Sequence, residues 1–261
     1  MKRVLASISM ILALTFFFPL LISASDVALP WFFLETNRTR YTAYQAGNPG
    51  LPFEKVLAFV NVRVDKGFYN DIVTVDDPDS ISVLVNKNFA LPQGYVPSDL
   101  VSVGGNHRLR AEVAEQLEKM RAEMNSLGFR IFVVSTYRTH QSQANRHSNA
   151  ARSFGIESAD RQYARAGHSE HQTGLAVDLL QRTNVRNMSQ ARFQDTAEFA
   201  WLTENAHRYG FILRYPNEYR DIHGFIFEPW HWRYVGVDIA TAMYDEGIAL
   251  FEEYYGKHLV F

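Results

Sequence analysis

Hydrophobic and polar positions repeat with a helical period in the middle of the chain. Between residues 106 and 127, apolar residues recur at intervals of three and four, with charged residues between them: Leu109, Val113, Leu117, Met120 and Met124. This spacing places the apolar side chains on one face of a helix. Gly128 is a suitable helix end. We therefore predict an amphipathic helix whose apolar face packs on a core.

Short apolar runs and further helical patterns follow this helix. The runs predict strands at residues 129–134, 175–180, 211–213, 225–227 and 230–234. Helical spacing predicts helices at residues 140–154, 195–209, 237–243 and 249–255, the first of them capped by Thr139. Because strands and helices do not alternate strictly, the pattern favours an α+β domain with an antiparallel sheet over a parallel sheet.

The N-terminal part of the chain is less regular. Residues 41–52 are rich in Gly, Asn and Pro, which indicates a loop, whereas residues 56–64 and 81–85 resemble strands. No internal repeat or low-complexity tract is present in the sequence. We predict a lead module, residues 26–105, packed onto a main domain, residues 106–261.

The first 25 residues have the pattern of an export segment. Lys2 and Arg3 precede an apolar run from Val4 to Ile22, and small residues lie just before Asp26. The run is also long enough for one membrane span. Two interpretations stay open, a cleaved signal peptide and an uncleaved membrane anchor. Both place the body of the chain outside the cytoplasm, in the cell envelope or the extracellular medium.

Composition limits the chemistry that the chain can perform. The 261 residues include 26 Lys and Arg against 28 Asp and Glu, and no basic run stands out. This balance argues against a nucleic-acid partner. The chain contains no cysteine, so disulfides and thiolate ligands are excluded. Any metal ion must be held by His, Asp or Glu.

The stretch from residue 167 to residue 178 carries a histidine and an aspartate seven residues apart. On a helix, His171 and Asp178 would lie about 10.5 Å apart along the axis, too far for one zinc ion with ligand atoms at about 2 Å. If both bind one metal, the chain must turn between them, and Gly174 permits such a turn. On this spacing alone, a surface histidine and a strand-end aspartate are an equally good interpretation.

A second stretch, residues 227–232, offers the side chains that such a site would need. His231 is a candidate third ligand, and Glu228 is a candidate general base. Two histidines and one aspartate leave one position of a tetrahedral zinc site for water, whose pKa zinc lowers to about 7. Pro229 can kink the chain so that Glu228 and His231 converge.

A third stretch, residues 135–143, joins a predicted strand to a predicted helix. Arg138 could bind a carboxylate through two hydrogen bonds or stabilise an oxyanion. Gln143 follows one helical turn later and could face the same cleft. A surface salt bridge is the alternative for Arg138.

Together, the three stretches resemble the VanY-like D-alanyl-D-alanine carboxypeptidases, part of a zinc peptidase superfamily that includes the hedgehog signalling domain. The family pattern Ser-x-His-x-x-Gly-x-Ala-x-Asp is matched at residues 169–178, and Glu-x-Trp-His at residues 228–231. The pattern Ser-Gly-Tyr-Arg is met at residues 135–138 with Thr136 in place of glycine. The resemblance extends over roughly residues 84–255.

This resemblance implies an antiparallel sheet flanked by helices, with a zinc site in a cleft on the sheet. It implies that His171, Asp178 and His231 bind Zn²⁺ and that Glu228 is the base. The implied activity is removal of the C-terminal D-alanine from peptidoglycan stem peptides, through attack of a zinc-activated water.

The resemblance also assigns residues to the substrate. Arg138 would polarise the scissile carbonyl or hold the terminal carboxylate, and Ser169 and Gln143 would line the pocket for the terminal residue. Two alternatives stay open: an L,D-carboxypeptidase or endopeptidase on the same scaffold, and a non-catalytic zinc-binding module. Glu228 and Arg138 argue against the second alternative, since metal binding alone needs neither.

Overall fold

The computed structural model describes residues 29–181 and 190–260. The chain divides into two units, residues 1–31 and residues 32–261, and every helix and strand among the described residues belongs to the second. The predicted export segment lies outside the described residues. Within the described ranges, no helix is both long enough and apolar enough to cross a membrane.

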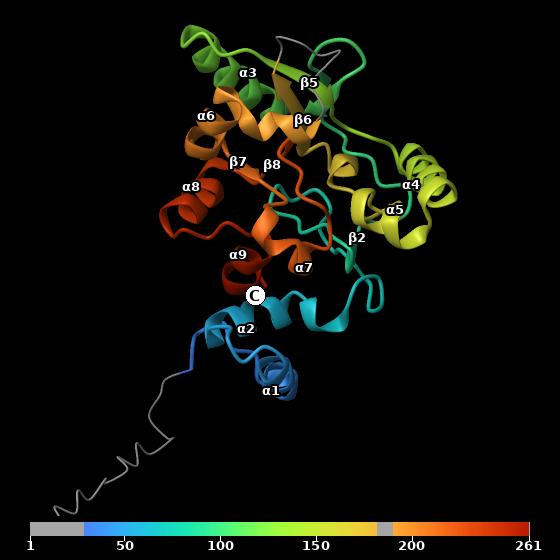
Figure 1. Ribbon diagram of the computed structural model, residues 1–261, viewed down its shortest axis with the longest axis vertical. Helices are drawn as coiled ribbons and strands as arrows, with labels where there is room; N and C mark the ends of the chain where they lie inside the picture. Colours follow the sequence, from blue (N-terminus) through green and yellow to red (C-terminus); the bar gives the residue numbers. More distant parts are fainter. Residues whose placement is uncertain (1–28, 182–189, 261) are drawn as a thin grey trace, which may run out of the picture. The chain divides into compact units, whose positions relative to one another are not determined.

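A four-stranded antiparallel sheet with the order β5–β6–β8–β7 is the largest sheet of the described residues and lies in the upper half of the second unit in Figure 1. Its strands are β5 (Ile131–Ser135), β6 (Ala176–Gln181), β7 (Phe211–Leu213) and β8 (His231–Tyr234). Two small sheets lie outside it, formed by β1 (Val73–Thr74) with β2 (Phe89–Ala90) and by β3 (Leu100–Ser102) with β4 (Arg108–Arg110). The predicted α+β class with an antiparallel sheet is confirmed.

The second unit also contains α-helices. They are α1 (Arg38–Gly47), α2 (Phe53–Asn61), α3 (Ala111–Ser126), α4 (His140–Phe154), α5 (Ile156–Gln162), α6 (Ala197–Asn205), α7 (Arg220–His223), α8 (Val237–Asp245) and α9 (Phe251–His258). Of these, α2 lies beside α9 and α1 beside α2, away from this sheet (Figure 1). Short 3₁₀ helices include η3 (Glu170–Thr173) and η6 (Ala206–Tyr209). Thr139 caps α4 as predicted, because its hydroxyl accepts a hydrogen bond from the backbone N–H of Ser142.

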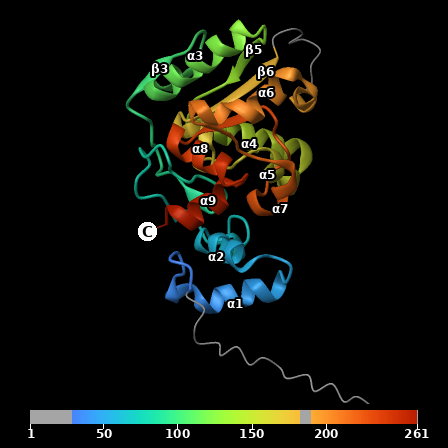
Figure 2. The ribbon, with the colours of Figure 1, turned by 90° about the vertical axis from the view of Figure 1, so that its left-hand side faces the viewer.

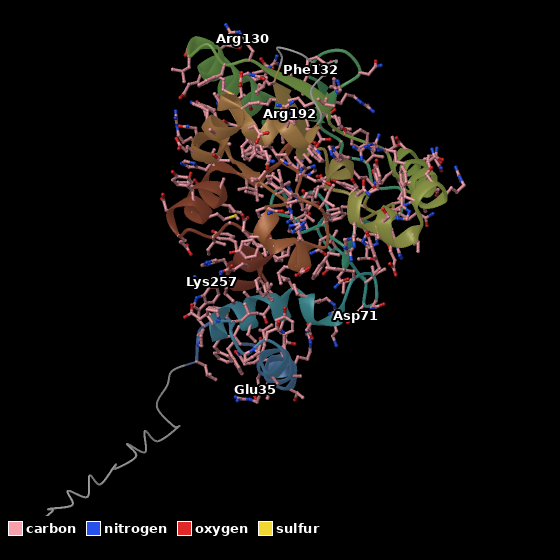
Figure 3. All side chains as sticks on the ribbon, viewed as in Figure 1. Glu35, Asp71, Arg130, Phe132, Arg192 and Lys257 are labelled. Carbon is pink, nitrogen blue, oxygen red and sulfur yellow. The ribbon has the colours of Figure 1, made fainter. Side chains whose placement is uncertain are left out.

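The amphipathic helix predicted from the apolar spacing is α3. The five apolar residues of the predicted face are all fully buried, but only four of them lie on α3. Leu109 belongs to strand β4, so the helix begins at Ala111, later than predicted. The five residues share one core with Val177 and Leu179 of β6 and with Trp232 of β8. Strand β6 is buried on both faces, which explains why its residues are apolar except for Asp178 and the terminal Gln181. On the edge strand β5, by contrast, Phe132 is 41% exposed and lies at the periphery (Figure 3).

Several N-terminal expectations are wrong. The run predicted as a strand at residues 56–64 forms most of α2, and the loop predicted at residues 41–52 contains much of α1. All residues of α2 from Val56 to Asn61 are buried, and α2 lies between α1 and α9 (Figure 2). A short apolar run that is buried on every side carries no periodicity that separates helix from strand. Residues 81–85 and 225–227 also form no strand.

The predicted domain boundary between the lead module, residues 26–105, and the main domain, residues 106–261, stays a prediction. Strands β3 and β4 pair with each other across it. The side-chain amide of Asn61 on α2 donates to the carbonyl oxygen of Gly256 on α9 at 3.0 Å, and Lys55 forms an ion pair with Glu253 at 2.9 Å. The lead segment is thus bonded directly to the C-terminal helix.

Gly256 lies where α9 packs against α2. A Cβ atom at this position would come within 2.0 Å of the carbonyl oxygen of Ala58. We expect Gly256→Ala to lower the free energy of unfolding by about 3 kcal/mol, because the two helix backbones would have to separate.

Gly47 on α1 is the matched control for this prediction, since a Cβ atom added there would meet no neighbouring atom within 4 Å. Gly47→Ala is expected to change the same free energy by less than about 1 kcal/mol. Urea denaturation followed by circular dichroism measures both variants. Equal stability of the two variants would contradict the close approach of α2 and α9.

Candidate metal centre and active site

The turn predicted between His171 and Asp178 is present. His171 lies on η3, and Gly174 follows with φ +69°, in the left-handed region that glycine adopts without strain. From Gly174 the chain enters β6, which carries Asp178. The turn folds His171 back over the strand, so that its Nε2 lies 3.3 Å from Oδ1 of Asp178.

His231 reaches the same place from the neighbouring strand. Asp178 on β6 and His231 on β8 are direct cross-strand partners. Nδ1 of His231 lies 3.1 Å from Oδ1 of Asp178. The three residues are buried, and their ligand atoms lie within 4.8 Å of one another. The structure therefore brings together the three candidate ligands predicted from the sequence.

The spacing of these atoms fits zinc. Ligand atoms at about 2 Å from a tetrahedral ion lie about 3.3 Å from each other, which agrees with the separations of 3.1 and 3.3 Å to Asp178. The set consists of two imidazole nitrogens and a carboxylate oxygen, as in catalytic zinc sites with one position left for water.

The outward nitrogen of each histidine has an acceptor that fixes the ring. Nδ1 of His171 lies 2.8 Å from the carbonyl oxygen of Thr136, and Nε2 of His231 lies 3.1 Å from Oε2 of Glu170. Each outward nitrogen donates to its acceptor, which leaves the lone pair of the inner nitrogen for a metal. The threonine that departs from the family pattern contributes here through its backbone, while its hydroxyl accepts from the N–H of Arg108.

Burial and charge set the protonation of the three candidate ligands. Burial lowers the pKa of His171 to about 4, which keeps the imidazole neutral. Although burial favours the neutral acid, His171 and His231 hold the pKa of the Asp178 carboxyl below its usual range. Against the effect of burial, Asp178 and Glu170 raise the pKa of His231 to about 9. A cation bound at Nδ1 of His231 takes the place of that proton.

The three residues line a cavity of about 150 Å³. Arg138, Gln143 and Glu228 line the same cavity, so it gathers six of the seven residues predicted for the site. The remaining lining residues are Arg146, Gln162, Tyr163, Ala164, Tyr215, Phe225, Ile226 and Trp230. Ser169 is buried at the start of η3 and is not among the described residues that line the cavity.

Glu228 enters the cavity from the turn that precedes β8. The backbone N–H of His231 donates to the carbonyl oxygen of Glu228 at 3.1 Å, which closes the turn at Pro229. Both side chains consequently face one cavity, as the kink predicted. Burial raises the pKa of the Glu228 carboxyl to about 8. A carboxylate in this environment has a strong tendency to accept a proton.

Arg138 is held in a fixed orientation. Its Nη1 donates to Oε1 of Gln143, and its Nη2 donates to Oγ of Ser135 at 2.9 Å. Gln143 in turn donates from Nε2 to the carbonyl oxygen of Ala164 at 2.6 Å. Gln143 therefore has partners at both ends of its amide and positions Arg138. Its predicted contact with the substrate's terminal residue stays a prediction.

The sequence interpretation missed Glu170, the acceptor for His231. Glu170 lies within the first motif but was given no role, because the carboxylate next to a candidate ligand could equally be solvent-exposed. The sequence pattern does not mark Glu170 as buried, because the predicted strand begins only at residue 175. Arg214 and Arg233 carry a clearer signal, since they are charged residues next to or within predicted strands.

Comparison with known proteins places this arrangement among peptidases. The family model VanY, described as D-alanyl-D-alanine carboxypeptidase, matches residues 106–237. YodJ of Bacillus subtilis, whose name assigns it to the carboxypeptidases, is 37% identical over 209 residues, which are 74% of this chain and 76% of YodJ. The matched region of the family model contains every residue predicted for the site.

Two solved structures share the fold. The LdcB LD-carboxypeptidase is 37% identical with a TM-score of 0.66, over 71% of this chain and 90% of that one. The D,D-pentapeptidase VanY from a VanB-type resistance cassette, in complex with Zn(II), is 31% identical with a TM-score of 0.57, over 66% of this chain and 97% of that one. Together with the His–Asp–His cluster, the bound Zn(II) identifies zinc as the cofactor.

Proposed function

Because this chain belongs to the VanY family of D-alanyl-D-alanine carboxypeptidases, we propose that it is a zinc carboxypeptidase that removes the C-terminal D-alanine from peptidoglycan stem peptides. The observation that carries the proposal is the cavity in which Glu228 and Arg138 face the three candidate ligands. A site that only bound zinc would need neither a buried carboxylate nor a buried guanidinium beside the metal.

The proposed mechanism assigns a role to each side chain. His171, Asp178 and His231 would hold the zinc ion, which would lower the pKa of a water molecule and polarise a carbonyl oxygen. Glu228 takes the proton of the attacking water and passes it to the leaving amine of the terminal residue. The proton thus moves from nucleophile to leaving group through one carboxylate.

Arg138 is proposed to bind the substrate. Gln143 and Ser135 use two of its N–H donors, which leaves the others for the carboxylate at the end of the peptide or for the developing oxyanion. Burial lowers the pKa of Arg138 only to about 10, so the guanidinium stays charged at neutral pH. The small cavity suits a terminal residue as small as alanine.

Two classes of scissile bond are compatible with this site. Cleavage between two D-residues is our first candidate, because the family model that matches the chain is described by that activity. Cleavage between an L- and a D-residue is the second candidate, because the LD-carboxypeptidase LdcB shares 37% identity and a TM-score of 0.66. The export that we propose from the N-terminal pattern would place the enzyme beside a cell-wall substrate.

Defined stem peptides test the proposal. The zinc-loaded full chain is incubated with penta-, tetra- and tripeptide stems, and the products are identified by mass spectrometry together with an enzymatic assay for D-alanine. We expect the pentapeptide to lose D-alanine and the tetrapeptide to stay intact. Conversion of tetrapeptide to tripeptide would establish the second candidate instead. Release of D-alanine from neither peptide, with zinc bound, would contradict the proposed function.

A further inference from the structure

Four charged side chains are buried directly behind the candidate metal site. Glu170, Arg214, Arg233 and Glu252 are each at most 1% exposed. Oε1 of Glu170 accepts from Nε of Arg214 at 2.6 Å and from Nη1 of Arg233 at 3.0 Å. Its other oxygen, Oε2, is the acceptor for Nε2 of His231. Glu170 therefore joins the candidate ligand His231 to two buried guanidinium groups.

The contacts continue to the C-terminal helix. Nη1 and Nη2 of Arg214 donate to the two carboxylate oxygens of Glu252 on α9, at 2.9 and 2.7 Å. The side-chain amide of Asn86 also donates to Glu252, at 3.2 Å. An unbroken series of hydrogen bonds thus runs from His231 through Glu170 and Arg214 to Glu252.

The geometry of Arg214 determines which oxygen of Glu170 remains for the histidine. A guanidinium is a rigid planar fork, and two parallel hydrogen bonds to one carboxylate fix its orientation. With its terminal nitrogens bonded to Glu252, Arg214 donates from Nε to Oε1 of Glu170, the same oxygen that accepts from Arg233. Oε2 of Glu170 is then left for Nε2 of His231.

Burying four charged side chains costs free energy of hydration, so their presence here calls for a functional reason. Ion pairs in the interior lose hydration, and apolar residues of similar volume would often stabilise the protein equally well. In a low-dielectric interior, the loss of one partner also disturbs the others. Histidine ligands depend on such an acceptor, because it fixes the tautomer and the orientation of the ring.

We infer that Glu170, Arg214 and Glu252 form a positioning relay through which helix α9 sets the zinc affinity of His231. The relay rests on the proposed assignment of His231 as a zinc ligand and does not require any particular substrate. Glu252 is not among the described residues that line the cavity. Its side chain bonds to Arg214 and Asn86, so its effect on His231 passes through Arg214, which bonds to Glu170.

Glu252→Gln tests the relay, and Glu253→Gln is its matched control. Glu253 is the next residue on α9 and forms its ion pair with Lys55. Zinc affinity of the full chain is measured by competition with a chromophoric chelator at neutral pH. We expect Glu252→Gln to weaken zinc binding about 10- to 100-fold, and Glu253→Gln to leave it nearly unchanged.

Two further measurements separate the relay from a general loss of stability. The ¹⁵N shifts of the His231 ring report its tautomer and are expected to change in Glu252→Gln but not in Glu253→Gln. The double variant Glu170→Gln with Glu252→Gln should lose less affinity than the product of the two single losses, since both act on one series of contacts. If Glu252→Gln is folded and binds zinc like the wild type, the inference is wrong.

A second substitution, Glu252→Asp, tests the relay if the Glu252→Gln variant does not fold. Glu252→Asp keeps the charge but is one methylene too short to form both bonds to Arg214, and it should weaken zinc binding measurably. Unchanged affinity in Glu252→Asp would then overturn the relay. A wild type that binds zinc but releases no D-alanine contradicts only the proposed function, whereas a wild type without zinc at His231 overturns the relay as well.

Discussion

Glu228→Gln is expected to lower kcat for release of D-alanine by about 10³-fold, the effect of removing a positioned general base. Glutamine has nearly the size and shape of glutamate but cannot take a proton from water. KM and zinc content should stay close to the wild-type values, because Glu228 is not among the three candidate ligands. Steady-state kinetics with the preferred stem peptide, together with metal analysis of the same sample, measures all three quantities.

Glu118→Gln serves as the control for this substitution. Glu118 lies on α3, where it is exposed and pairs with Arg121. The same chemical change there should leave kcat unaltered. If Glu228→Gln retains full activity with zinc bound, the assignment of the base is wrong.

His171→Ala should remove both zinc and activity. The site offers three protein ligands, and a tetrahedral zinc ion that retains only two is bound far more weakly. We expect zinc to fall from about one per chain to a trace, and D-alanine release to fall below detection. Elemental analysis after dialysis and the peptide assay measure the two effects. Wild-type protein stripped by a chelator should regain activity when Zn²⁺ is added, whereas the variant should not.

His168→Ala is the control, since it removes a nearby buried histidine that is outside the cluster. His168 directs Nδ1 to the carbonyl oxygen of Asn86 at 2.8 Å. Its replacement should leave the zinc content unchanged even if the stability falls. Loss of zinc in His168→Ala but not in His171→Ala would show that the wrong histidine has been assigned.

The main domain could be predicted from the sequence because its elements are amphipathic or flanked by clear end signals. Helix α3 buries one face, and Thr139 and Gly155 bound α4. The segment around α2 could not be predicted, because it is buried by α1 on one side and α9 on another. That environment depends on contacts such as the one between Asn61 and Gly256, which are 195 positions apart. The local spacing of apolar residues gives no information about contacts at that separation.

The candidate ligands could be predicted because each lies in a short motif whose residue types suit zinc. The relay behind them could not, since Glu170, Arg214 and Glu252 are distant in sequence and meet only in the folded chain. For Ser169 the contact with substrate implied by the motif stays a prediction, and the described residues that line the cavity do not include it. A motif match shows which residue types occur together in the sequence, but it does not show what each side chain contacts in the folded chain.

The carbonyl oxygen of Thr136 holds His171, and a carbonyl is present whatever side chain the residue bears. The hydrogen bond that holds His171 therefore does not require glycine at position 136, although the Thr136 hydroxyl adds a bond from the N–H of Arg108. Searches for related enzymes that insist on glycine there would overlook chains whose metal centre is intact.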